Sequence, residues 1–186
     1  MEWNKHLELR DKHSFLSASS HAWINYDEEK FKKVYRNMKA KELGTRIHAL
    51  ASELISLGQK LPRTKQTLNM YVNDAIGYGM HTEQILYYSP YAFACTDAIS
   101  FEKKMLRIHD LKTGVAKASI AQLRVYEAYF CLQNGIKPGN IDSELRIYQN
   151  DDIFIDHPEP SDIVPIIDKI ITFNKIMTKI DEGDSL

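Results

Sequence analysis

The sequence predicts an α+β domain in which a small mixed β-sheet is flanked by helices. Two helical segments precede three closely spaced strands, and a further helix separates the third strand from a fourth. A last amphipathic helix is appended after the fourth strand. With 186 residues and a hydrophobic fraction of 44%, the chain is long enough for one sizeable core, so we expect a single domain over residues 1–186.

The helices are predicted from apolar residues that recur at helical spacing. They cover residues 31–61, 67–76, 117–134 and 161–180. The first helix ends before Pro62, and Gly44 is an alternative point at which it divides in two. Gly135 closes the third helix, as glycine commonly does just past a helix end.

The strands are predicted from shorter segments in which apolar side chains alternate or run together. They cover residues 83–88, 92–102, 104–112 and 144–149. A tight turn at residues 102–104 makes the second and third strands neighbours.

Two aspartates lie on these neighbouring strands, each on the apolar side. In the second strand, alternation places Asp97 on one face with Ile99 and with Phe93, Cys95 and Phe101. In the third strand, Asp110 shares a face with Ile108 and Lys112. A carboxylate that faces a core is costly unless something pairs with it, so we expect a hard divalent cation and a charged substrate here. The alternatives are a hydrogen-bonded turn for Asp97, and an exposed strand end for Asp110 and Lys112.

Charge is distributed unevenly along the chain. Residues 1–65 carry 13 Lys or Arg and 8 Asp or Glu, and the segment Lys30–Arg46 contains only one acid, Glu42. Such a segment could follow a phosphate backbone, although an ordinary solvated helix face is the simpler interpretation. There is no apolar run that would span a membrane and no apolar signal region at the N-terminus. We therefore expect a cytoplasmic protein with no membrane partner.

Five short motifs, in order, carry a resemblance to a known family. They are Leu16–Ser20 (LSASS), Gly44–His48 (GTRIH), Thr96-Asp97, Asp110–Gly114 (DLKTG) and Gln122–Tyr126 (QLRVY). Together they resemble the RecB-like branch of the PD-(D/E)xK nuclease superfamily, especially its standalone phage and prophage exonucleases. The resemblance covers about residues 14–150. The usual glycine shortly before the strand-two aspartate is missing, and Tyr26-Asp27 stands where many relatives have Cys-Pro.

The resemblance implies a PD-(D/E)xK restriction-endonuclease-like core and a metal site. Asp97, Asp110, the main-chain carbonyl of Leu111 and His48 would be ligands of Mg²⁺ or Mn²⁺. Lys112 would orient the attacking water or offset charge on the scissile phosphate. No iron–sulfur cluster is expected, because the chain has only two cysteines.

The resemblance also implies roles for two side chains of the third helix. Gln122 and Tyr126 are one turn apart, so they would face the catalytic cleft together. The alternative for Tyr126 is a place in the core with Leu123 and Phe130.

The function that these motifs imply is a metal-dependent DNA nuclease, with an exonuclease in phage-type recombination or DNA processing preferred. Its partners would be duplex DNA ends or single strands, in a bacterial host cell if the chain is phage-encoded. Some relatives form rings, which implies a homo-oligomer as one arrangement, and a recombinase or single-strand-binding protein is a further expected partner. The alternatives are a structure-dependent endonuclease, a non-catalytic DNA- or partner-binding protein on the same fold, and a phosphatase acting on small molecules.

Overall fold

The computed structural model describes residues 4–10 and 12–183. Residues Met1–Trp3, which carry part of the sequence argument against a signal region, lie outside this range. The chain divides into two compact units, Met1–Glu42 and Leu43–Leu186. Within the described residues, no helix has both the length and the apolar character needed to cross a bilayer.

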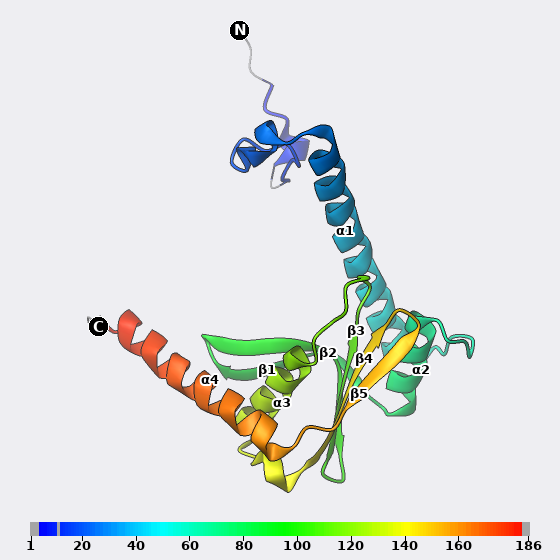
Figure 1. The fold of residues 1–186 in the computed structure, drawn as a ribbon, viewed down its shortest axis with the longest axis vertical. Coiled ribbons are helices and arrows are strands. Elements are labelled where there is room, and N and C mark those ends of the chain that lie inside the picture. Colours follow the sequence, from blue (N-terminus) through cyan, green and yellow to red (C-terminus); the bar gives the residue numbers. More distant parts are fainter. Residues whose placement is uncertain (1–3, 11, 184–186) are drawn as a thin grey trace. The chain divides into compact units, whose positions relative to one another are not determined.

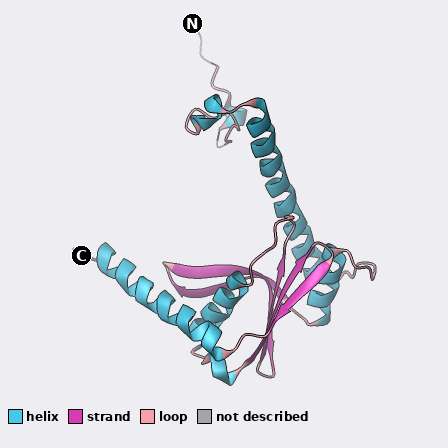
Figure 2. Ribbon diagram, in the orientation of Figure 1, coloured by secondary structure: helices cyan, strands magenta, loops and turns pink. Residues whose placement is uncertain are grey.

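Four α-helices and five strands make up the regular structure of the described residues (Figures 1 and 2). The helices are α1 (Glu28–Ser56), α2 (Thr67–Gly77), α3 (Ala121–Asn134) and α4 (Pro160–Asp181). The strands are β1 (His81–Ser89), β2 (Ala92–Glu102), β3 (Met105–Leu111), β4 (Asp142–Gln149) and β5 (Asp152–Asp156). Three short 3₁₀ helices, η1 (Leu7–Leu9), η2 (His21–Asn25) and η3 (Pro138–Asn140), complete the list.

The sheet of the second unit has the strand order β1-β2-β3-β4-β5. Its neighbours are antiparallel except β3 and β4, which run parallel because α3 connects them. The predicted α+β class and the small mixed sheet flanked by helices are therefore confirmed.

Each face of the sheet has its own core. On one face, α2 and the C-terminal part of α1 pack through Ala51, Leu54 and Val72 against Leu111 and Tyr148. On the other face, α3 packs on a second set of buried side chains that includes Ile99, Leu106, Ile108, Leu123 and Leu145. Figure 1 shows α2 and α3 on opposite sides of the strands. Successive residues of β3 alternate between these two cores, as the period of a strand requires.

Several features of the structure differ from the predicted elements. Gly44 does not interrupt α1, which is continuous from Glu28 to Ser56. The third helix begins at Ala121, because the amide of Gln149 binds the main chain at Gly114, Ala116 and Ala118 and holds this segment outside the helix. The strand β5 was not predicted.

The face predicted to be apolar in β2 is mostly exposed. Phe93 and Phe101 are 57% and 43% exposed, and Cys95 is exposed too, whereas Ile99 is buried. The alternate residues Thr96 and Ala98 are fully buried instead. Side-chain size therefore misled the prediction, because helices cover the face of β2 that carries the small residues over this part of the strand.

Candidate active site

The candidate site lies where two neighbouring strands part. The ladder between β2 and β3 runs from Glu102 and Met105 to Ala98 and His109, and then stops. The ladder between β3 and β4 continues to Leu111. Asp97 and Asp110 are therefore the first residues beyond the last β2–β3 pair, on adjacent strands as predicted. Their charges act on each other, since Asp97 contributes to raising the pKa of Asp110.

Asp110 is a buried carboxylate whose hydrogen bonds are incomplete. The residue is 1% exposed, and the Lys112 ammonium donates a hydrogen bond of 3.1 Å to Oδ1. The same ammonium lies 2.9 Å from Oδ2, but outside hydrogen-bonding geometry, so Oδ2 accepts no hydrogen bond from the described residues. Burial, followed by the nearby charge of Asp97, raises the pKa of Asp110 to about 6. A further positive charge at this carboxylate would be favourable.

Asp97 is held by groups from two other elements. Its Oδ2 accepts a hydrogen bond of 2.9 Å from the Leu111 main-chain N–H. The same oxygen lies 3.3 Å from Nδ1 of His48 on α1. The hydrogen bond to Asp97 raises the pKa of His48, against the effect of burial. His48 thus lies beside Asp97, and the Leu111 backbone joins the two aspartate strands.

A chain of hydrogen bonds leads from Lys112 into the helix α3. Lys112 donates to Oε1 of Gln122 at 2.9 Å, and the amide of Gln122 donates to the Tyr126 hydroxyl at 2.5 Å. Tyr126 is also buried in the core with Leu123 and Phe130. The ring therefore belongs to the core, while the hydroxyl belongs to the polar chain that begins at Asp110.

Gly44 brings α1 close to the segment after Lys112. A methyl group added at Gly44 would lie 2.7 Å from Oγ1 of Thr113. Real Cβ atoms essentially never approach another heavy atom so closely, so any side chain at position 44 would force Thr113 to move. The motifs that contain His48 and Lys112 are thus in direct contact.

Two residues near the site were not predicted from the sequence. Tyr71 of α2 is 2% exposed, and its pKa is raised by burial and then by the charges of Asp97 and Asp110. Glu83 of β1 lies between the residues paired with Ala98 and Thr96, so it is opposite Asp97. Only the register of β1 and β2 places Glu83 there, and residue spacing does not determine that register.

The acids of the site have different partners. Across residues 4–10 and 12–183, no group of three His, Cys, Asp or Glu side chains has an arrangement that could hold a metal ion. Asp97 is turned toward His48 and the Leu111 amide, whereas Asp110 is turned toward Lys112. The two carboxylates therefore have separate protein partners.

Comparisons with known protein families, with curated proteins and with solved structures found no match for this chain.

Proposed function

We propose that this protein is a metal-dependent DNA nuclease with a PD-(D/E)xK core, acting by preference as an exonuclease. The observation that carries the proposal is the pair Asp97 and Asp110 at the end of the β2–β3 ladder, with Lys112 bonded to the second of them. A buried acid with an unsatisfied oxygen, a second acid on the next strand and a lysine suit the hydrolysis of a phosphodiester.

The donor atoms suit Mg²⁺ or Mn²⁺. Asp97 and Asp110 offer carboxylate oxygens, and the main-chain carbonyl of Leu111 would add a third oxygen. His48 offers a nitrogen, which Mn²⁺ accepts more readily than Mg²⁺. The unsatisfied Oδ2 of Asp110 favours a cation at this place. When bound, the cation would supply an activated water and neutralise charge on the phosphate.

The other polar side chains would position the reacting groups. Lys112 would orient the attacking water or offset charge on the scissile phosphate, because its ammonium lies beside Asp110. Gln122 would hold this ammonium in place, and Tyr126 would hold Gln122. Gln122 and Tyr126 need not touch the substrate for this role, so we treat both as positioning residues.

DNA is preferred as substrate to a small phosphate ester. The segment of residues 30–41 holds six Lys or Arg and no acid, which suits a polymer of phosphates. An exonuclease is preferred because end trimming requires no separate recognition domain. We further propose that it acts in the cytoplasm, in phage-type recombination or DNA processing. A ring-shaped homo-oligomer and a recombinase or single-strand-binding partner belong to the same proposal.

The test compares cleavage of linear DNA and of covalently closed circular DNA in Mg²⁺, Mn²⁺ or EDTA. Asp110→Asn keeps the shape of the side chain and removes its charge, and we expect it to lower cleavage by roughly 10²-fold or more. Asp142→Asn, at an exposed position of β4, is the matched control. Loss of linear DNA alone, abolished by EDTA and by Asp110→Asn, would support the proposal. Cleavage of the closed circle would instead indicate an endonuclease.

A second candidate is a non-catalytic DNA- or partner-binding protein on the same fold. It is favoured by one observation, namely that Asp97 and Asp110 have separate protein partners, His48 and Lys112. DNA binding by a well-folded chain that cleaves nothing in Mg²⁺ or Mn²⁺ would favour this candidate and contradict the first.

A further inference from the structure

The N-terminal part of α1 has an unusual concentration of positive charge. Residues 30–41 hold six Lys or Arg and no acid, and all of them belong to the first unit, Met1–Glu42. The candidate active site lies in the second unit, so this charge plays no part in the geometry described above. It therefore calls for an explanation of its own.

Acids of the helix neutralise some of these cations and leave others unpaired. Lys32 forms ion pairs with Glu28 at 2.6 Å and with Glu29 at 3.3 Å. Lys30, Lys33 and Arg36, in contrast, have no carboxylate partner for their side chains within residues 4–10 and 12–183. The unpaired cations are free to meet charges from outside the protein.

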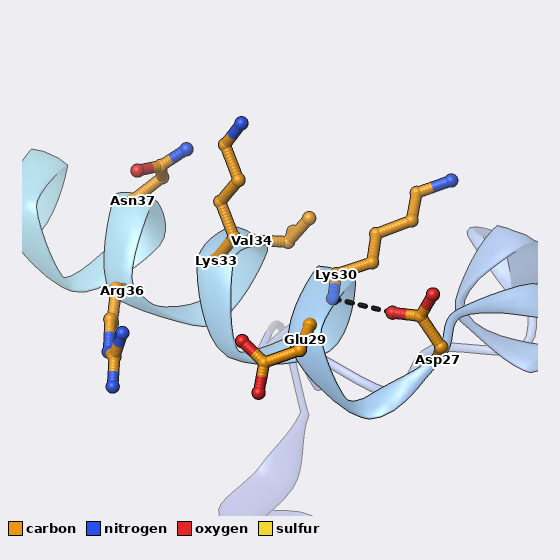
Figure 3. A pocket seen from close by; sticks show the side chains of 7 residues that line it. All are labelled: Asp27, Glu29, Lys30, Lys33, Val34, Arg36 and Asn37. Carbon is orange, nitrogen blue, oxygen red and sulfur yellow. Dashed lines mark hydrogen bonds between the residues drawn. The ribbon is translucent and has the colours of Figure 1, made fainter.

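The unpaired cations line a hollow on the surface of about 830 Å³. Figure 3 shows that Lys30 and Lys33 project to the same side of the helix as Asn37. Asp27 and Glu29 also line the hollow, but both have partners. The carboxylate of Asp27 accepts the main-chain N–H of Lys30 at 2.7 Å and caps the helix, and Glu29 is bonded to Lys32. Lys30, Lys33 and Arg36 thus face one carboxylate, Asp27, that no other cation neutralises, so the hollow keeps an excess of positive charge for an anion.

A second cavity, of about 410 Å³, lies beside this hollow and shares Val34 with it. Its lining includes the rings of Phe15, Trp23 and Tyr26, of which Trp23 and Tyr26 are only half-buried. The indole N–H of Trp23 donates to the Ser17 carbonyl at 2.9 Å, which fixes the ring. The Lys30 ammonium lies 4.4 Å from the centre of the Tyr26 ring and connects the aromatic cavity to the basic hollow.

We propose that this unit binds single-stranded DNA, with phosphates at Lys30 and Lys33 and a base against Trp23 in the aromatic cavity. Fixed aromatic rings beside unpaired cations are the features that hold single strands without regard to sequence. A duplex would offer the phosphates but keep its bases stacked, and an acidic protein would leave the aromatic cavity unused. The inference rests on the proposed nuclease function, since the bound polymer would be its substrate.

The test measures binding of fluorescein-labelled dT20 to the full chain by anisotropy, in EDTA and over a range of salt concentrations. Lys30→Gln/Lys33→Gln removes two phosphate contacts, and Lys169→Gln/Lys175→Gln on α4 removes two exposed lysines elsewhere as a control. Each contact with a single strand contributes about 0.7 to the slope of log K against log salt. We therefore expect the first variant to lose about 1.4 of that slope and roughly 25-fold in affinity at 0.1 M salt. The control should bind as the unaltered chain does.

A second readout follows Trp23 directly. Trp3, the other tryptophan, is replaced by Phe, so that the fluorescence comes from Trp23 alone. Quenching by dT20, but not by poly-glutamate, is expected. Unchanged affinity in Lys30→Gln/Lys33→Gln would overturn the inference. Equal binding of poly-glutamate with no quenching would also overturn it, in favour of an acidic protein partner.

The binding test and the cleavage test fail separately. Metal-dependent cleavage without a contribution from Lys30 and Lys33 would overturn only the present inference. Binding of dT20 through these lysines with no cleavage in Mg²⁺ or Mn²⁺ would overturn only the nuclease proposal.

Discussion

Glu127 gives the sharpest test of the energetics of this fold. This residue of α3 is 2% exposed, and its Oε1 accepts a hydrogen bond of 2.8 Å from the Ser143 hydroxyl. The other oxygen, Oε2, is buried and has no hydrogen-bond partner among the described residues. Burial raises the pKa of Glu127 from 4.5 to about 7. The folded chain therefore holds this proton more tightly than the unfolded chain does.

The sign of the pH dependence follows from this difference. Below about pH 4.5 the carboxyl is protonated in both states and costs nothing, whereas its contribution to stability is lost as the pH rises through about 7. At 1.36 kcal/mol for each pH unit, the interval from 4.5 to about 7 corresponds to about 3 kcal/mol. Glu127→Gln imitates the protonated form, so it should match the unaltered chain near pH 4.5 and exceed its stability by about 3 kcal/mol at pH 8.

The assay is urea unfolding followed by circular dichroism at pH 5, 6, 7 and 8. Other groups also titrate in this range, but they are common to both chains and cancel in the difference. Glu102→Gln, at an exposed position of β2, should show no such trend and serves as the control. A stability difference that stays constant with pH, or a Glu127→Gln chain that is less stable at pH 8, would refute the reasoning.

Three further predictions concern the site and its surroundings. Gly44→Ala should destabilise the chain by about 1–3 kcal/mol through the contact with Thr113. In a Thr113→Ala background the same substitution should instead stabilise the chain by up to about 1 kcal/mol, because alanine has the higher helix propensity. Urea unfolding of the unaltered chain, the two single variants and the double variant checks this, and equal effects of Gly44→Ala in both backgrounds would contradict it. If the nuclease proposal holds, Lys112→Ala should lower the cleavage rate by roughly 10²–10³-fold. Gln122→Ala should lower the rate by roughly 10-fold with little change in KM, because Gln122 only holds the lysine. A larger loss in Gln122→Ala than in Lys112→Ala would show that Gln122 does more than position Lys112. Burial, followed by the charges of Arg146 and Arg107, lowers the pKa of His109 from 6.5 to about 3. The free energy of unfolding of the unaltered chain should therefore fall by about 4–5 kcal/mol between pH 6.5 and 3 through this group. His109→Gln should remove that part of the acid sensitivity, and an acid-unfolding curve that His109→Gln leaves unchanged would contradict the prediction.

The sequence contained enough information to predict most of the helices and strands, because their apolar residues follow clear periods. The strand β5 was missed because the turn before it lacks the usual sequence signal. Asn150 and Asp151 both have positive φ, at 53° and 59°, and join Gln149 to Asp152 in a two-residue hairpin turn. Neither is glycine, so the usual sign of such a turn is absent.

The candidate site was predictable only in part. Asp97 and Asp110 could be placed on neighbouring strands, with Lys112 directly after the second of them, because a short turn fixes which strands meet. The contact of His48 with Asp97 depends on how α1 packs against the sheet, and spacing along the chain contains no information about that packing. The exposed face of β2 was also predicted wrongly because the packing of the helices is not readable from the sequence. Large aromatic residues suggested a buried face, but the covering helices decide burial.

The turn between β2 and β3 is a position where substitutions could raise the stability of this protein. Lys103 and Lys104 both adopt left-handed backbone conformations, with φ of 52° and 68°, which cost roughly 1–2 kcal/mol for a residue with a side chain. An Asn-Gly pair would adopt the same turn with little strain. The turn is at the opposite end of the β2–β3 ladder from Asp97 and Asp110, so this replacement would leave the site intact. A chain stabilised there would tolerate more damaging substitutions at the site and still fold.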